Sequence, residues 1–95
     1  MLNFLKFRQY KPSTLVDVWG ESEILRLGSE GESVRVIQRF LQALGHYSLG
    51  IDGYYGAEME NAVRAFQQQI GMNADGVVDE RTWRAIKRLR LFLTI

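Results

Sequence analysis

The sequence contains DGYYGAEMENAVRAFQQQIG, residues Asp52–Gly71, and a shorter copy of it, DGVVDERTWRAIKRL, residues Asp75–Leu89. In both copies an Asp-Gly pair precedes a segment whose apolar residues are spaced as on one face of a helix. Aspartate bonds its own backbone and glycine adopts positive φ, so the pair favours a tight turn. The sequence therefore predicts two turn-helix units of one design.

A further helix is expected before these units, from Ser29 to Leu44. Ser29 and Glu32 have the S-x-x-E spacing of a capping box, and Gly45 stands where a left-handed helix end is wanted. The apolar positions of this segment recur at steps of three and four residues, which places them on one stripe: Val34, Ile37, Leu41 and Leu44.

The helices of the two units follow from similar signals. The first is expected from about Ala57 to Ile70 with Gly71 as its stop, and the second from Asp79, a good N-cap, to about residue 90. The inner face of the first unit's helix is expected to be Met59, Ala62, Val63, Phe66 and Ile70, with Gln67 on its polar face. Packed on the preceding helix, the units predict a mainly α, compact three-helix domain over residues 25–90.

The flanks of this domain differ from it in pattern. Residues 1–24 hold apolar residues at alternating positions around a proline-containing turn, which predicts a short extended segment, either a β-hairpin or a partner-docking arm. Residues 91–95, LFLTI, form an apolar tail after the expected helix end. Both flanks are expected to pack on the helices or to meet another protein.

Composition limits the functional classes. The chain has 95 residues, 46% apolar and 24% charged, so we expect one small folded domain. Its formal net charge of +1 gives no general attraction to nucleic acid or to an anionic membrane. Apolar runs fall far short of the roughly 20 residues that cross a bilayer, and no secretory signal is recognisable. A role outside the cytoplasm would therefore need release or assembly by another route.

Catalytic constellations are missing from the sequence. There is no cysteine and a single histidine, His46, which excludes a disulfide framework, a thiolate zinc site and a paired-histidine metal motif. Glu58 and Glu60 stand two positions apart on a helix and so point about 200° away from each other, which does not suit a glycosidase acid/base pair. We expect no enzyme activity, no metal and no cofactor.

Several short motifs stand in a fixed order along the chain: LRLGSEG from Leu25, VRVIQ, LGHY, DGYYG, AVRAFQ, the second Asp-Gly pair and a final Thr-Trp. This order resembles the peptidoglycan-binding domain attached to bacterial and phage cell-wall hydrolases, over about Leu25 to Leu89. The sequence departs from that family's pattern where His46 is inserted and displaces Tyr47, where Met59 replaces the usual Thr, and where Asp79 replaces the usual Gly.

The resemblance implies non-catalytic binding of bacterial peptidoglycan, which would tether an attached assembly to the cell wall. Such binding needs a shallow groove with an aromatic face and a few polar groups for amides and carboxylates. The candidate ligand-binding residues are Tyr47, Asp52, Tyr54, Gln67, Trp83 and Arg84. Structural roles stay open for several of them: Trp83 as a core residue, Asp52 as a turn former, and Gln67 as a side chain that fixes backbone.

Two further interpretations stay open. Arg81, Arg84 and Arg88 share one helix face, which suits anionic wall polymers, a phosphate track of nucleic acid or simply a solvated surface. The chain as a whole is either a wall-binding module or an interaction subunit that kept the scaffold and lost glycan binding. The unmatched flanks favour a protein partner such as a phage tail, an injection machine or an envelope complex, and hence a place in the cell envelope, a virion or a secretion machine.

Overall fold

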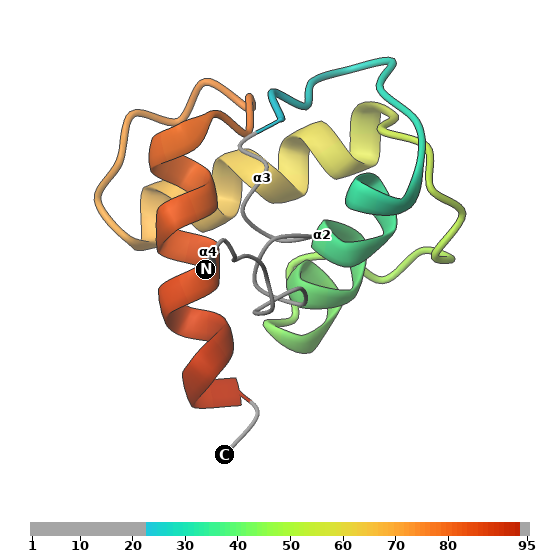
Figure 1. The fold of residues 1–95 in the computed structure, drawn as a ribbon. Coiled ribbons are helices and arrows are strands. Elements are labelled where there is room, and N and C mark those ends of the chain that lie inside the picture. Colours follow the sequence, from blue (N-terminus) through green and yellow to red (C-terminus); the bar gives the residue numbers. More distant parts are fainter. Residues whose placement is uncertain (1–22, 94–95) are drawn as a thin grey trace, which may run out of the picture.

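The computed structural model describes residues 23–93 of the chain, with side chains up to residue 90. These residues form three helices, α2 (Glu32–Ala43), α3 (Ala57–Gln69) and α4 (Glu80–Leu93), which lie around one interior (Figure 1). Within residues 23–93 the only β-type pairings are two isolated bridges. The prediction of a mainly α, three-helix domain is confirmed. The predicted hairpin and docking arm fall on residues 1–24, nearly all of which lie outside the described residues.

The start of α2 differs from the prediction. The helix begins at Glu32 with Gly31 as its N-cap, and no side chain caps this end through a hydrogen bond. Ser29 Oγ instead accepts a hydrogen bond from the Arg26 N–H at 3.0 Å. The predicted capping box of Ser29 and Glu32, and a helix start at Ser29, are therefore wrong. The physical reason is that the Ser29 carbonyl accepts the Tyr55 N–H, so this stretch pairs with another segment instead of coiling.

The segment before α2 runs across both Asp-Gly units. Leu25 exchanges two backbone hydrogen bonds with Val78, at 3.0 and 2.8 Å. Farther along, the Gly28 N–H donates to the Tyr55 carbonyl and the Ser29 carbonyl accepts the Tyr55 N–H, both at 2.9 Å. Figure 1 shows this blue-green segment passing from beside the turn that precedes α4 to the start of α2. The segment thereby fixes the position of one unit relative to the other.

The predicted helix ends of α2 and α3 are confirmed. Gly45 and Gly71 follow the C-caps with φ of 85° and 79°, the left-handed conformation that glycine adopts most easily. In each case the next N–H reaches back into the helix, from His46 to the Leu41 carbonyl at 2.9 Å and from Met72 to the Gln67 carbonyl at 2.8 Å.

Helix α4 begins as predicted and ends later than predicted. The Asp79 carboxylate accepts the Thr82 N–H at 3.2 Å, which confirms Asp79 as a side-chain cap. The helix continues through Leu93, whereas the sequence predicted its end near residue 90. Most of the predicted apolar tail, residues 91–95, is therefore a continuation of α4. Arginine and leucine are strong helix formers, and the sequence has no glycine or proline there to stop the helix.

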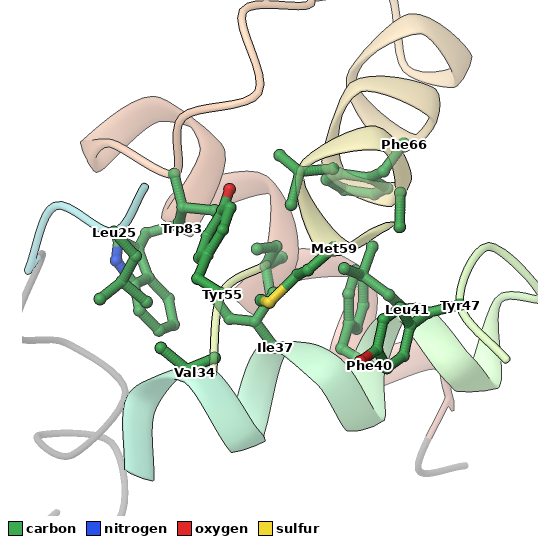
Figure 2. Close-up of a cluster of buried hydrophobic side chains, with 14 residues drawn as sticks. Leu25, Val34, Ile37, Phe40, Leu41, Tyr47, Tyr55, Met59, Phe66 and Trp83 are labelled. Atoms are coloured by element: carbon green, nitrogen blue, oxygen red, sulfur yellow. The ribbon is translucent and has the colours of Figure 1, made fainter. Parts of the chain in front are cut away.

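The core lies between the three helices and the segment before α2. Figure 2 shows Tyr55 and Met59 next to the α2 side chains Val34 and Ile37, with Phe66 farther from α2. The rings of Phe40 and Phe66 meet edge to face, with centroids 5.3 Å apart. Of the predicted inner face of α3, four members are buried and Ile70 is half-buried. The buried apolar residues are Leu25, Val34, Ile37, Phe40, Leu41, Tyr47, Tyr55, Met59, Ala62, Val63, Phe66, Val78, Trp83 and Ile86.

Candidate functional site: two grooves built on the Asp-Gly units

A buried glutamine of α2 builds the first turn. The Gln38 side chain is fully buried, and its Oε1 accepts the Gly53 N–H at 2.9 Å. Its Nε2 donates to Asp52 Oδ1 at 2.9 Å, to the Tyr54 carbonyl at 3.1 Å and to the Tyr47 hydroxyl at 3.3 Å. One buried amide therefore bonds three groups of the turn, the Gly53 N–H, the Asp52 carboxylate and the Tyr54 carbonyl, and has its own polar atoms paired as burial requires.

The second turn is built in the same way by Gln67 of α3. Gln67 is 1% exposed, and its Oε1 accepts the Gly76 N–H at 2.9 Å. Its Nε2 donates to Asp75 Oδ1 at 3.2 Å, to the Val77 carbonyl at 3.0 Å and to Thr82 Oγ1 at 3.1 Å. The sequence interpretation placed Gln67 on the polar face of its helix. The structure places it in the interior, where it fixes backbone.

Gln38 was not predicted from the sequence to have a role, although a signal was present. Gln38 stands four residues after Val34 and three before Leu41, and so belongs to the apolar stripe of α2. A lone amide in such a stripe must find partners inside the fold. Gln67 stands beside the apolar Phe66 in the sequence, which likewise indicated an amide that needs partners inside the fold.

The Asp52 carboxylate stabilises the turn in which it lies. Its Oδ1 accepts the Tyr54 N–H at 2.9 Å in addition to the Gln38 amide. Asp75 repeats this contact with the Val77 N–H at 3.0 Å. The Gln38 amide, followed by the Tyr54 N–H, lowers the pKa of the Asp52 carboxyl below its ordinary value. The Asp52 carboxylate is thus a turn former that also borders an exposed hollow.

The two tyrosines of the candidate set lie in different environments. Tyr47 is buried, and its hydroxyl donates to the Gly50 carbonyl at 3.1 Å. Burial, with a smaller effect of the Asp52 charge, raises the pKa of the Tyr47 phenol, which therefore keeps its proton. Tyr54 is 48% exposed, the same as Leu49 across the loop. Of these two rings, Tyr54 presents the larger surface to solvent.

A shallow groove runs between the loop after α2 and the first half of α3. One part is a hollow of about 420 Å³ that includes Tyr54, Asp52 and Leu27, and the adjoining part measures about 290 Å³ and includes His46 and Asn61. Both parts share Tyr47, Leu49 and Glu58. We call the whole the tyrosine groove. Three of the predicted site residues, Tyr47, Asp52 and Tyr54, therefore come together here.

A second hollow, of about 570 Å³, lies between the C-terminal end of α3 and the outer face of α4. We call it the arginine groove, because Arg81, Arg84 and Arg88 line it. Arg84 is the predicted site residue that it contains. Its Nη2 also bonds Glu80 Oε2 at 2.8 Å, a pair in which both side chains are more than 60% exposed.

The last predicted site residue, Trp83, is buried. It is 2% exposed, and its Nε1 donates to the Glu23 carbonyl at 2.6 Å. Trp83 and Gln67 therefore stabilise the scaffold beneath the grooves and do not reach their surfaces. Within residues 23–90 no cluster of His, Asp or Glu side chains is suited to a metal ion. None of the helices formed by residues 23–93 has the length and apolar character needed to cross a membrane.

Known proteins are similar to this chain in sequence and in fold. An N-acetylmuramoyl-L-alanine amidase of Bacillus licheniformis, CwlL, is 42% identical over 66 residues, which are 63% of this chain and 18% of the amidase. The crystal structure of the SleB N-terminal domain superposes with a TM-score of 0.70 at 28% identity, covering 73% of this chain and 94% of that domain. The crystal structure of the Burkholderia AP3 phage endolysin gives 0.64 at 42% identity, covering 67% of this chain and 24% of the endolysin.

The extent of these matches shows which part of the relatives is shared. The chain spans less than a quarter of the amidase and of the endolysin, but nearly all of the SleB domain. Residues 30–86, which hold both glutamine-bound turns and α2, α3 and the first half of α4, match one family over more than half of the chain. This protein belongs to the peptidoglycan binding domain family.

Proposed function

We propose that this chain binds bacterial peptidoglycan without catalysis and that the tyrosine groove is the binding surface. The observation that carries the proposal is Tyr54, an aromatic ring 48% exposed at the edge of the groove, on a turn that the fold holds rigidly. Family membership supports the ligand class.

Tyr54 is suited to recognition because its position is fixed. Its N–H and carbonyl are bonded by Asp52 and Gln38, at 2.9 and 3.1 Å. The ring lies against Gly56: a Cβ atom on that glycine would stand 3.3 Å from Tyr54 Cε2. Part of the ring is thereby supported, and the exposed part is available to a sugar ring or a peptide. A preorganised aromatic side chain contributes contact area at a small entropic cost.

The proposed consequence of binding is tethering. Weak contacts to a repetitive polymer raise the local concentration of whatever is linked to the module. The relatives suggest two kinds of linked body, since one is an amidase and another a phage endolysin. We place the chain at the bacterial cell wall, attached to a hydrolase, a phage tail or an envelope machine, with residues 1–24 and the C-terminal end as the connection to a protein partner.

Retention of the purified chain on insoluble peptidoglycan tests the proposal. We expect retention at low salt, and a loss of about tenfold in affinity for Tyr54→Ala, the magnitude expected for an aromatic contact of about 1.4 kcal/mol. Gln68→Ala, on an exposed part of α3, is the control and should bind like wild type. Circular dichroism of each variant verifies the fold.

The result that contradicts the proposal is equally plain. Failure of the wild-type chain to be retained would favour the alternative, a structural subunit that kept the scaffold without glycan binding. Normal retention of Tyr54→Ala would exclude the tyrosine groove as the binding surface.

A further inference from the structure

The arginine groove takes the place on the second unit that the tyrosine groove takes on the first. When the Asp-Gly pairs are aligned, Ala85 of the arginine groove corresponds to Ala62 of the tyrosine groove. The other aligned groove residues differ in charge: Glu58, Asn61 and Ala65 in the first groove become Arg81, Arg84 and Arg88 in the second. The tyrosine groove is thus lined by two acidic side chains, Asp52 and Glu58, and the arginine groove by three basic ones.

Helix stability does not account for these arginines. Helix α4 begins at Glu80, so Arg81 stands in its first turn, where the helix dipole disfavours a cation. The three arginines are three and four positions apart on one face, where like charges repel. Among the side chains of residues 23–90, neither Arg81 nor Arg88 forms an ion pair, and Arg84 pairs only with the exposed Glu80. Such an exposed pair is weak enough for a ligand to replace.

Most of the remaining lining is apolar, with Asn73 as the polar exception. Ile70, the C-cap of α3, and Met72 in the loop after it line the same hollow as the arginines, with Leu89 from α4. A ligand that fills it must therefore carry negative charge beside small apolar groups. The planar guanidinium group bonds a carboxylate through two parallel N–H donors.

We propose that the arginine groove binds the free carboxylates of a short peptide, whose aliphatic side chains contact Ile70 and Leu89. The inference rests on the proposed function, because the peptide that the wall polymer presents is its stem peptide. A phosphodiester wall polymer offers the same negative charge but few apolar groups for Ile70, Met72 and Leu89. The apolar half of the groove therefore favours the peptide. In this arrangement the tyrosine groove binds one part of the polymer, and the arginine groove binds the carboxylates of its stem peptide.

The test uses soluble muropeptides in two forms, one with free carboxylates and one whose carboxylates have been amidated, measured by calorimetry with the full chain at low salt. We expect the free form to bind about tenfold more tightly, as for one or two charge-assisted hydrogen bonds. The double variant Arg81→Gln, Arg88→Gln should lose this preference. Arg39→Gln, which removes an exposed arginine of α2, should keep it.

A second variant should strengthen binding at the arginine groove. Glu80→Gln removes the carboxylate that pairs with Arg84. The muropeptide with free carboxylates should therefore bind this variant more tightly than it binds the wild-type chain. The Arg81→Gln, Arg88→Gln variant should also unfold at an unchanged or slightly higher urea concentration, because a cation leaves the first turn of α4. A folded variant without the preference supports the inference.

The outcomes separate this inference from the proposed function. If the wild-type chain is retained on insoluble peptidoglycan but binds both muropeptide forms equally, the arginine-groove inference fails and the proposed function stands. If it neither is retained nor binds a muropeptide, both fail. Walls with and without their anionic polymers distinguish the source of charge: retention that depends on the phosphate polymers, with equal binding of the two muropeptide forms, overturns the peptide assignment.

Discussion

Gln38 and Gln67 hold the two Asp-Gly turns through the same set of hydrogen bonds. Each Oε1 accepts the glycine N–H of its turn at 2.9 Å. Each Nε2 donates to the aspartate Oδ1 and to the carbonyl of the residue after the glycine, Tyr54 or Val77. The fourth contact differs, since Gln38 meets the Tyr47 hydroxyl and Gln67 meets the Thr82 hydroxyl. The repeated unit therefore consists of a glutamine in one helix and the turn that leads into the next.

Replacing either glutamine should cost more stability than any exposed substitution on the same helix. Gln67→Ala leaves the buried Gly76 N–H without its partner and removes one of the donors to the Val77 carbonyl, and we expect a loss of about 2–4 kcal/mol in the free energy of unfolding. Gln38→Ala should behave alike. The adjacent exposed Gln68→Ala should stay within about 0.5 kcal/mol of wild type. Equal urea midpoints for Gln67→Ala and Gln68→Ala would show that these hydrogen bonds do not stabilise the fold.

Tyr55 of the first unit connects the two units through a side-chain hydrogen bond, which its counterpart in the second unit, Val78, cannot form. It is fully buried, and its hydroxyl donates to the Gly76 carbonyl at 2.5 Å, whereas its counterpart Val78 pairs with Leu25. Burial raises the pKa of the Tyr55 phenol, so the donor keeps its proton. Tyr55→Phe should lower stability by about 1–3 kcal/mol by leaving that carbonyl unpaired. Thermal unfolding should show no comparable change for Tyr54→Phe, the exposed neighbour.

Two left-handed glycines should differ in their tolerance of a methyl group. Gly71, at φ 79°, has no atom within 4 Å of a Cβ, so Gly71→Ala carries only backbone strain of about 1 kcal/mol. At Gly76, φ 76°, a Cβ would lie 2.8 Å from Glu60 Cγ and 2.9 Å from Arg64 Nε. Gly76→Ala should therefore cost about 2–3 kcal/mol, strain plus displacement of both side chains. Denaturant titration of the two variants gives the comparison, and a smaller cost at Gly76 would contradict it.

The depressed pKa of Asp52 predicts a specific loss of stability in acid. Near its ordinary pKa of about 4, the unfolded state binds more protons at this carboxyl than the folded state does. Its contribution is therefore complete above about pH 4 and is lost as the pH falls through the lower, folded value. Asp52→Asn keeps an oxygen acceptor and should flatten the dependence of stability on pH below about 4. Glu58→Gln, at an exposed carboxylate, is the control, and an unchanged slope in Asp52→Asn would refute the assignment.

The sequence by itself determined the three helices, most of their boundaries and the repetition of the Asp-Gly unit. These depend on local chemistry: the spacing of apolar residues on each stripe, the glycine stops Gly45 and Gly71, and the Asp79 cap. The end of α4 was placed too early because the apolar run after residue 90 was interpreted as a tail, although its residues favour a helix.

The start of α2 and the division of the polar side chains between interior and grooves could not be predicted from the sequence. Both depend on contacts between residues that are distant in the sequence. Ser29 matches a capping box locally, yet its carbonyl is taken by Tyr55, 26 positions along the chain. Gln67 and Trp83 have polar groups that suit a ligand, but packing buries both, and their hydrogen bonds are made within the protein: Gln67 bonds Asp75, Thr82 and backbone, and Trp83 bonds the Glu23 carbonyl. Tyr54 and Tyr55 are neighbours in the sequence, and pairing with the segment before α2 turns Tyr55 inward and leaves Tyr54 at the groove.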